Sequence, residues 1–413
     1  MEFTESQQSW SNKLNISFED ITNQGNKIRL VDSESKDDSH LDLYCYPRCS
    51  NQEKDVIKSC RGILVSDNKI VLQTYPYSTE YTTKDKEIES LSNENFKELK
   101  FVEAHEGSII RVYNYNNKWY ISTHKKIDSF RSKWSSKTSF GQQFLDALAV
   151  SIKKSNELSS QITFDSETKF ESQFFNTLDT SKCYCFLVRN TNENRIVSKP
   201  YAEPTLFHTG TFNMSDFAHD FETTCGINKP KELVFENFQQ LKEHVENINI
   251  DELQGVIVYK GEKHIKIVSP EYARMFEIRG NEPSIKFRYL QLRLDKEKTD
   301  TLYTLYPKFT DTFEEYENTI YKICQNIYES YVKRYIHKSY VTLPKEEYTI
   351  SKACHTWHLE DRIKNRISLR KVQEKMNEQP ANNINKMIRR YLHQKNEIVQ
   401  ESHINNDNVN QEQ

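Results

Sequence analysis

A change in hydrophobic periodicity near Leu290 divides this chain of 413 residues into two parts with different expected folds. Before residue 280, short apolar runs are bounded by turn residues, and the run over 108–113 alternates on a two-residue period, which is typical of β-strands. Pairs of such runs meet at turn residues and predict β-hairpins over 61–72, 108–123, 183–197 and 255–268. Helical spacing occurs here over 141–155 and 235–245, and the charged stretch 32–40 is predicted to be a loop or unstructured.

Beyond Leu290 the apolar residues recur at intervals of three and four, which is the period of an α-helix. One aromatic stripe has this spacing and comprises Phe313, Tyr316, Ile320, Cys324, Ile327, Tyr331 and Tyr335. The stripe is most simply a packing face, and a surface for a partner or RNA is the alternative. Further helices are predicted over 361–376 and 383–393.

These patterns predict an α+β fold in which a domain with antiparallel sheets precedes an α-helical C-terminal domain. The expected boundaries are 1–285 for the first domain and 286–398 for the helical one. Residues 399–413 are rich in Asn and Gln and are predicted to be a disordered tail. A chain of this length can bury the core that two domains need.

The composition argues against a nucleic-acid coat protein, a membrane protein and a disulfide-rich secreted protein. With 57 basic and 60 acidic residues, the chain is not a globally basic nucleic-acid coat protein, although local basic patches are still allowed. No apolar run approaches the roughly 20 residues that span a bilayer, and the N-terminus lacks the hydrophobic core of a signal peptide. The eight cysteines are scattered without a CxxC pair, which favours reduced thiols. We therefore expect a soluble, intracellular, cytoplasmic protein with no membrane partner.

The segment from Val102 to Tyr113 contains a glycine, Gly107, between two strand-like runs. Other strand-like segments with polar residues at or near one end stand before and after it along the chain. They are Cys60-Arg61-Gly62-Ile63-Leu64-Val65, Trp119-Tyr120-Ile121-Ser122-Thr123, Cys185-Phe186-Leu187-Val188, Gln254-Gly255-Val256-Ile257-Val258 and His264-Ile265-Lys266-Ile267-Val268. Each segment alone is weakly specific, but their order and spacing make the set more informative.

In this order the segments resemble the motifs of covalent nucleotidyltransferases, in particular RNA ligases related to the phage tRNA-repair enzyme. The resemblance covers roughly residues 55–280 and implies an antiparallel-sheet nucleotidyltransferase domain of the ATP-grasp-like ligase type. In that family a lysine attacks the α-phosphate of ATP, and carboxylates hold the metal and orient the lysine. An active member would need ATP and Mg and would act on RNA. The Asn- and Lys-rich composition also resembles that of ligase-like proteins of large DNA viruses.

The resemblance places Ala104 in the slot of the nucleophilic lysine, where alanine has no lone pair to offer phosphorus. It places Gln254 and Val188 in the slots of two acidic residues, and Val268 in the slot of a second lysine. A nearby lysine does not replace the missing one, because Lys100 precedes Ala104 by roughly 13 Å of extended strand. No catalytic residue is therefore identified.

Other residues of the same motifs keep their charge or hydrogen-bonding capacity, and the resemblance implies that they bind a nucleotide. They are Arg61, Glu106, Arg111, Arg195, Gln254 and Lys266. An arginine in a strand is more often solvated or ion-paired, so that role is the alternative for the three arginines.

Residues 111–140 contain seven basic side chains and one acid, Asp128, with aromatic residues interleaved. Cations that contact phosphates, beside aromatic faces that stack on bases, are typical of a surface that binds single-stranded nucleic acid. The residues predicted to bind RNA are Lys118, Trp119, Lys125, Lys126, Arg131 and Lys133. The alternative is a solvated basic face over aromatic residues of the core.

Two features of the helical part are predicted to have no special chemistry. Cys354, His355 and His358 are of the residue types that bind zinc, but no fourth ligand is evident, so no metal site is predicted. The basic run from Arg362 to Lys371 is predicted to be a solvated helical face, and RNA binding is its alternative.

Taken together, the sequence predicts an RNA-ligase-like protein that is catalytically degenerate and binds a nucleotide or RNA without a catalytic cofactor. Two other functions stay open. One is an active ATP-dependent RNA ligase that seals RNA ends through a covalent enzyme–AMP intermediate. The other is a structural or interaction scaffold, for which the sequence indicates no particular protein partner.

Overall fold

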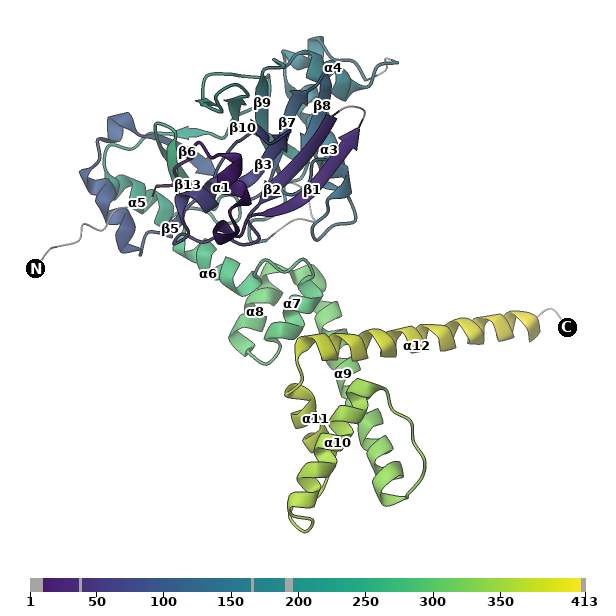
Figure 1. Ribbon diagram of the computed structural model, residues 1–413. Helices are drawn as coiled ribbons and strands as arrows, with labels where there is room; N and C mark the ends of the chain where they lie inside the picture. Colours follow the sequence, from purple (N-terminus) through teal and green to yellow (C-terminus); the bar gives the residue numbers. More distant parts are fainter. Residues whose placement is uncertain (1–9, 37–38, 165–166, 190–195, 410–413) are drawn as a thin grey trace, which may run out of the picture. The chain divides into compact units, whose positions relative to one another are not determined.

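The computed structural model describes residues 10–36, 39–164, 167–189 and 196–409. The chain divides into two compact units, Met1–Glu277 and Ile278–Gln413, and this division falls before the predicted boundary at 285. The first unit contains the β-sheets and the second contains helices, as Figure 1 shows. The predicted α+β class is therefore confirmed.

Three sheets form the first unit, and their strands pair antiparallel except for β14 with β5. The first sheet has the order β1 (Arg29–Lys36), β2 (Ser39–Cys45), β3 (Arg61–Ser66), β4 (Lys69–Leu72). The second has the order β11 (His219–Asp220), β10 (Thr205–Asn213), β9 (Lys182–Arg189), β7 (Ser108–Tyr115), β8 (Lys118–Ser122). The third has the order β12 (Glu232–Leu233), β6 (Lys100–Ala104), β13 (Gly255–Lys260), β14 (Lys263–Val268), β5 (Glu80–Thr82).

Short helices connect these strands. They are α1 (Phe18–Thr22), α2 (Asp55–Ser59), α3 (Phe140–Lys154), α4 (Phe170–Asn176) and α5 (Phe238–Glu246), with α6 (Pro270–Arg279) at the end of the unit. The longest of them, α3, buries one apolar face against the second sheet, where Phe144 and Leu148 pack with Ile110 and Phe186. The predicted helices over 141–155 and 235–245 are thus confirmed.

Three of the four predicted hairpins are confirmed: β3–β4, β7–β8 and β13–β14. Asn116 and Asn117 in the β7–β8 turn have φ of 49° and 59°. A two-residue turn of type I′ requires this left-handed backbone, which asparagine tolerates better than most residues. The turn chemistry read from the sequence therefore corresponds to the observed geometry.

The predicted hairpin over 183–197 is wrong in its second arm. β9 pairs with β10 and β7, and the return strand begins only at Thr205. Ile196 and Val197 lie in a loop, where their backbone N–H groups bind a carboxylate instead of a neighbouring strand. Residues 190–195 of this prediction lie outside the described residues.

The prediction of a loop over 32–40 is also wrong, because this stretch belongs to the β1–β2 hairpin. β1 is an edge strand whose partly buried positions include the carboxylates Asp32 and Glu34, while Leu30 is exposed, so it lacks the apolar alternation by which strands are recognised. Its carboxylates pair with lysines and an arginine of another segment, as described below. Residues 37 and 38 lie outside the described part.

The second unit consists of α7 (Ile285–Leu292), α8 (Lys296–Leu305), α9 (Thr310–Tyr331), α10 (Lys345–Glu360), α11 (Leu369–Asn377) and α12 (Ala381–Val409). The aromatic stripe is buried from Phe313 to Tyr331, which confirms a packing face. Beyond α9 the chain forms a π-helical turn, Val332–Ile336, so Tyr335 leaves the regular spacing and is partly exposed. The helix predicted over 361–376 begins only at Leu369, and α10 was not predicted.

Helix α12 continues to Val409, across most of the segment 399–413 for which the sequence predicts disorder. The sequence from Ala381 onward contains no glycine or proline that would stop a helix. Residues 410–413 lie outside the described residues. Among the residues that are described, no helix has the length and apolar character of a membrane span.

Candidate functional site

A cleft of about 330 Å³ opens in the first unit and is lined by residues of all three sheets and of the loops beside them. Its lining includes Ala104 at the end of β6, Gln254 just before β13, Lys266 on β14 and Arg61 at the start of β3. The structure therefore brings together four positions that the sequence separates by up to 205 residues (266 − 61). They are four of the positions assigned to the ligase-like motifs.

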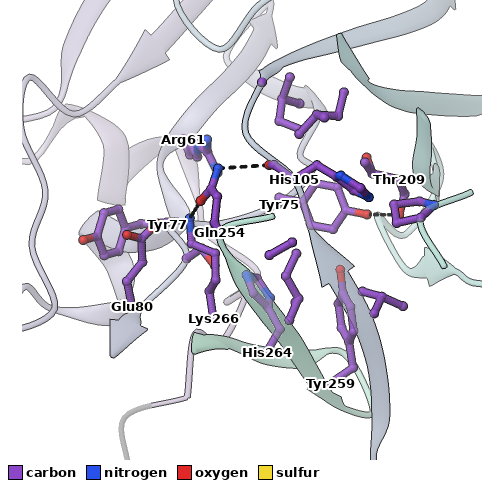
Figure 2. Close-up of a pocket in the computed structure, with 18 of the residues that line it drawn as sticks. Arg61, Tyr75, Tyr77, Glu80, His105, Thr209, Gln254, Tyr259, His264 and Lys266 are labelled. Atoms are coloured by element: carbon purple, nitrogen blue, oxygen red, sulfur yellow. Dashed lines mark hydrogen bonds and ion pairs between the residues drawn. The ribbon is translucent and has the colours of Figure 1, made fainter. Parts of the chain in front are cut away.

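Ala104 is 2 % exposed, and Gln254 fixes the chain beside it. The backbone N–H of Gln254 donates to the Ala104 carbonyl at 2.8 Å, and its side-chain Nε2 donates to the His105 carbonyl at 3.0 Å. Gln254 Oε1 accepts from Lys266 Nζ at 3.0 Å, as Figure 2 shows. An amide has one donor end and one acceptor end, so Gln254 serves both neighbours at once. A carboxylate here could not donate to the His105 carbonyl.

Lys266 is held from a second side, because its ammonium group also pairs with the Glu80 carboxylate. The two residues are register partners in the parallel β14–β5 pair. A second cavity of about 320 Å³ shares Glu80, Gly107, Gln254 and Lys266 with the cleft. The Gln254–Lys266–Glu80 set thus borders two cavities of the first unit.

Gly107 and Gly255 are required by close backbone approach around Ala104. A Cβ at Gly107 would lie 2.6 Å from the Val188 carbonyl oxygen, and one at Gly255 would lie 1.9 Å from the Ile267 carbonyl oxygen. Neither distance is possible for a side-chain carbon, so the packing of β6, β9 and β14 excludes any larger residue.

Aromatic rings and histidines cover much of the remaining cleft wall. Tyr75 donates through its hydroxyl to the Thr209 carbonyl at 2.7 Å, and its ring meets His264 edge-on at 6.1 Å. Tyr259 lies next to the same histidine, with ring centroids 5.6 Å apart. Tyr77 and His124 complete this set (Figure 2 shows Tyr75, Tyr77, Tyr259 and His264). The wall therefore offers flat faces beside polar edges.

Burial keeps these rings uncharged. It lowers the pKa of His264 to about 3, with further lowering by Arg61 and Lys266, and it lowers the pKa of His124 well below its usual value. Burial also raises the pKa of Tyr259 to about 12, and that of Tyr77 to about 12 with help from Glu80. At neutral pH these rings are thus uncharged, and the charged groups that line the cleft are Arg61, Lys266, Glu80 and Glu103.

Glu106, a predicted nucleotide-binding residue, is buried, and its carboxylate is hydrogen-bonded to other groups of the protein. Its carboxylate accepts from the backbone N–H groups of Ile196, Val197 and Ser198 at 2.5, 2.8 and 3.0 Å. The hydroxyl of Tyr272 donates to it at 2.9 Å. These four contacts satisfy the carboxylate and fix the 196–198 loop to the end of β6.

Arg111 and Val188 are likewise buried and do not line the cleft. Arg111 is 2 % exposed and donates to the carbonyls of Gly62 and Thr123 and to the Ser122 hydroxyl. Val188 packs in the core of the second sheet, and the neighbouring Leu187 is the residue of β9 that lines the cleft. Successive strand residues face opposite sides, so the one-residue shift decides which of them meets a ligand. Arg195 lies outside the described residues.

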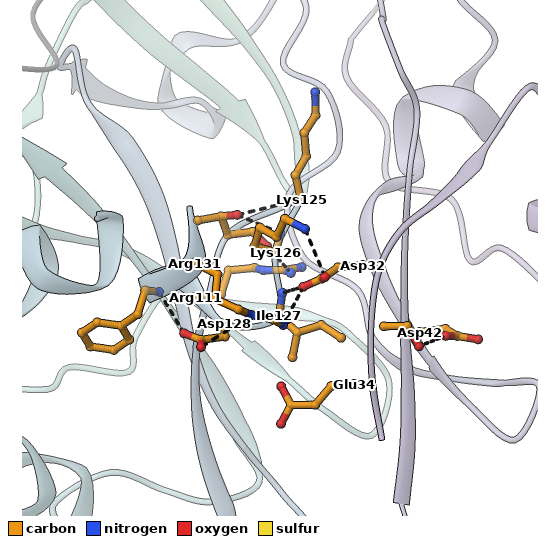
Figure 3. A network of polar contacts seen from close by, with 12 residues as sticks. Asp32, Glu34, Asp42, Arg111, Lys125, Lys126, Ile127, Asp128 and Arg131 are labelled. Atoms are coloured by element: carbon orange, nitrogen blue, oxygen red, sulfur yellow. Dashed lines mark hydrogen bonds and ion pairs between the residues drawn. The ribbon is translucent and has the colours of Figure 1, made fainter. Parts of the chain in front are cut away.

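The predicted RNA-binding residues lie on and beyond β8, where acids of β1 pair with several of them. Asp32 binds Lys126 at 3.1 Å and Arg131 at 3.2 Å, and it accepts from the Ile127 N–H at 2.9 Å, as Figure 3 shows. Glu34 binds Lys118 at 2.6 Å. These carboxylates reduce the positive charge that the sequence indicated.

The remaining members of that set differ from one another. Trp119 packs against the core and stacks on Phe175, with ring centroids 5.6 Å apart. Lys125 and Lys133 are exposed and have no ion pair within the described part of the chain, and Lys125 extends away from Asp32 in Figure 3. RNA binding at this surface stays a prediction that now depends on fewer cations.

The Cys354, His355 and His358 set lies in the second unit. Cys354 is fully buried, His355 stacks on Tyr335 with centroids 3.8 Å apart, and His358 Nδ1 donates to the Asn365 carbonyl at 2.7 Å. Across the described residues, no group of three or more His, Cys, Asp or Glu side chains is placed to hold a metal ion.

Sequence reasoning missed most of the cleft wall, notably Tyr75, Tyr77, His124 and Tyr259. None of these residues lies in the quoted motifs.

Comparison with known proteins finds relatives in viruses. The chain is 29% identical over 381 residues to the "Immediate-early protein ICP-46 homolog" of Invertebrate iridescent virus 3, which covers 88% of this chain and 80% of the relative. It is 26% identical over 370 residues to the homolog of the same name from Invertebrate iridescent virus 6, covering 85% and 79%. No protein-family model matches.

A more distant relative carries a ligase name. The chain is 23% identical over 309 residues to the "Putative bifunctional polynucleotide kinase/RNA ligase" of Autographa californica nuclear polyhedrosis virus, covering 70% of this chain and 40% of that protein. The predicted resemblance to RNA ligases, and to viral proteins, is therefore confirmed at the level of distant similarity.

Solved structures with partial similarity include two ligases. A putative ATP-dependent DNA ligase from Aquifex aeolicus has a TM-score of 0.38 and 14% identity, covering 71% of this chain and 73% of that one. Naegleria gruberi RNA ligase with pyrophosphate has a TM-score of 0.32 and 9% identity, covering 48% and 58%.

Proposed function

We propose that this ligase-like protein has lost covalent nucleotidyl transfer and acts as a reversible nucleotide-binding module. The observation that carries the proposal is the chemistry of the cleft at three positions, where Ala104, Leu187 and Gln254 present a methyl, an aliphatic and an amide group. Covalent transfer needs an amine nucleophile, and carboxylates that hold its metal. None of these three side chains supplies either group.

The donor set of the cleft does not fit a divalent cation. Mg²⁺ prefers several oxygen ligands that include carboxylates. Of the two carboxylates that line the cleft, Glu80 is paired with Lys266, which leaves Glu103 as the one carboxylate of the described lining without a cationic partner there. We therefore derive no catalytic step through a metal, and ATP is a ligand in this proposal rather than a substrate.

The groups that remain favour a nucleotide. The tyrosine and histidine rings offer flat faces for a base, and the guanidinium of Arg61 offers charge for a phosphate. The Arg61 side chain donates to the Pro76 carbonyl at 3.3 Å, and it forms no ion pair within the described chain, so its charge is available. A cavity of 330 Å³ is at the small end of the roughly 300–1,000 Å³ that ligand sites occupy.

Calorimetric titration of the full chain with ATP tests the proposal. We expect reversible binding, and we expect Arg61→Ala to weaken it by about tenfold, because one charge-assisted hydrogen bond contributes about 1.5 kcal/mol. Arg61→Lys keeps the charge and should lose less.

The matched control is Lys97→Ala, which removes a charge from an exposed position outside the cleft and should leave binding unchanged. Melting curves of all variants check that each one is folded. Failure of the wild-type chain to bind ATP, or equal binding by Arg61→Ala, would contradict the proposal.

A further inference from the structure

Another cavity, of about 550 Å³ and separate from the two cavities of the first unit, lies wholly within the helical unit. It is enclosed by the end of α9, the π-helical turn after it, α10, and the loop over 361–368 (the elements are labelled in Figure 1). We call it the α9–α10 cavity. Neither the ligase-like motifs nor the proposed nucleotide cleft includes any of its residues.

One wall of this cavity is aromatic. Tyr335 and His355 stack with centroids 3.8 Å apart and planes inclined by 17°. Tyr331 lies 4.8 Å from Tyr335 and its hydroxyl is 3.3 Å from His355 Nδ1, which orients the histidine ring. Tyr328 also lines the wall. The rings thus form an ordered platform instead of a set of independent side chains.

The π-helical turn is what aims Tyr335 at this cavity. A regular α-helix would carry the buried stripe of α9 onward, but the turn over Val332–Ile336 adds a residue to the repeat. Tyr335 is consequently half-exposed, and the next residue, Ile336, is 63% exposed.

The other wall carries positive charge. Lys338, Arg362 and Arg366 line the cavity, are exposed, and have no ion pair within the described part of the chain. No carboxylate is among the lining residues. The pKa of His355 is lowered, first by burial and then by His358, Lys338 and Arg362, which agrees with a positive field in the cavity.

We propose that the α9–α10 cavity binds a nucleotide unit of a single-stranded nucleic acid, with its base on the Tyr335–His355 stack and its phosphates at Arg362 and Arg366. Stacking on aromatic faces tolerates any base, and guanidinium groups bind phosphate bidentately. A phosphate alone would not need four aromatic rings, and an apolar ligand would not need three unpaired cations. The inference does not rest on the proposed function, because it uses no residue of the cleft.

Fluorescence anisotropy of a labelled short oligoadenylate, titrated with the full chain at several salt concentrations, tests the assignment. We expect Tyr335→Ala to weaken binding at least about fivefold, and Tyr335→Phe, which keeps the ring, to bind nearly as the wild type. The double variant Arg362→Glu, Arg366→Glu should also weaken binding and make the slope of log K against log salt shallower by about 1.4.

A double variant with the same change of charge, Lys322→Glu and Lys352→Glu, is the control. Both residues are exposed on helices of the same unit and neither lines the cavity. The inference is overturned if this control loses as much affinity as the arginine pair, or if Tyr335→Ala binds like the wild type.

Two further measurements separate binding of a single strand at this cavity from binding of a nucleotide in the cleft. Free AMP should displace the labelled oligonucleotide only at a much higher concentration than the unlabelled oligonucleotide does, and displacement at equal concentrations would overturn the single-strand assignment. Arg61→Ala is expected to bind the oligonucleotide normally. Loss of ATP binding with retention of oligonucleotide binding, or the reverse, separates failure of the proposed function from failure of this inference.

Discussion

Replacing Glu106 with alanine is expected to destabilise the first unit by about 4 kcal/mol, one of the two largest effects that the structure predicts. The buried carboxylate accepts three backbone N–H groups and one tyrosine hydroxyl. Hydrogen bonds to a charged group contribute roughly 1.5–3 kcal/mol each, and buried donors left without a partner add their desolvation cost. Alanine would remove all four contacts at once.

Urea unfolding monitored by tryptophan fluorescence measures this effect. Trp357 is in the second unit, so a Trp357→Phe background leaves Trp10, Trp119 and Trp134 to report on the first unit alone. Tyr272→Phe is the graded control, since it removes one of the four hydrogen bonds and should cost about 1 kcal/mol. A loss below 1 kcal/mol for Glu106→Ala would show that the carboxylate does not hold the 196–198 loop.

The second large effect is a loss of stability in mild acid. Burial lowers the pKa of His105 to about 4, that of His208 to about 4, and those of His219 and His264 to about 3. Arg189 and Lys229 lower the first two further, and His264 lowers that of His219. An unfolded histidine has a pKa of about 6.5, so the unfolded chain takes up protons at a pH where the folded chain does not.

The direction of the pH effect on stability follows from this difference between the folded and unfolded pKa values. Stability is fully present above about pH 6.5 and is lost as the pH falls toward the folded pKa values. At pH 5 each of the four histidines costs about 2 kcal/mol (1.5 pH units at 1.36 kcal/mol). His219 and His264 influence each other, so we expect a total loss of about 4–8 kcal/mol, against a typical stability of 5–15 kcal/mol.

The measurement is the free energy of unfolding of the first unit between pH 7.5 and 5, in the same Trp357→Phe background. His264→Phe should make the slope shallower by about 1.4 kcal/mol per pH unit, because one proton fewer is taken up on unfolding. His337→Ala, an exposed histidine of the second unit, should leave the slope unchanged. A flat profile between pH 6.5 and 5 would refute the account of these histidines.

Local sequence patterns were enough to predict the hairpins β3–β4, β7–β8 and β13–β14, since each joins two short apolar runs through a turn that only a few residues tolerate. They were not enough for β1, whose polar edge position hides the alternation, or for β10, which reaches β9 across a long loop. Non-local pairing of this kind depends on which surfaces meet, and a single sequence does not display that.

The candidate site was predictable only along its motifs. Ala104, Gln254 and Lys266 converge because β6, β13 and β14 are adjacent strands of the third sheet, and Arg61 lines the same cleft from the first sheet. Arg111 does not line the cleft, because its guanidinium donates to the Gly62 and Thr123 carbonyls. No local sequence pattern indicates these hydrogen bonds. The pairing of Asp32 with Lys126 and Arg131 was hidden for the same reason, as it joins residues almost a hundred positions apart.

We propose that the cleft binds a nucleotide but has no nucleophile that attacks the α-phosphate. Introducing a lysine alone should not produce transfer, because Ala104→Lys leaves an amide at Gln254 and an aliphatic side chain at Leu187, and neither supplies a carboxylate that could hold a metal. Wild type and Ala104→Lys are therefore both expected to bind ATP without forming a covalent adduct. An active RNA ligase treated in parallel shows that the conditions support adduct formation.

The most direct measurement is incubation of the full chain with α-labelled ATP and Mg²⁺ or Mn²⁺, followed by denaturing electrophoresis in which a lysine–AMP phosphoramidate stays attached. We predict no label on the wild-type chain under conditions where calorimetry shows ATP bound. Label on the wild-type protein, traced by mass spectrometry to Lys266 or any other lysine, would contradict the loss of catalysis.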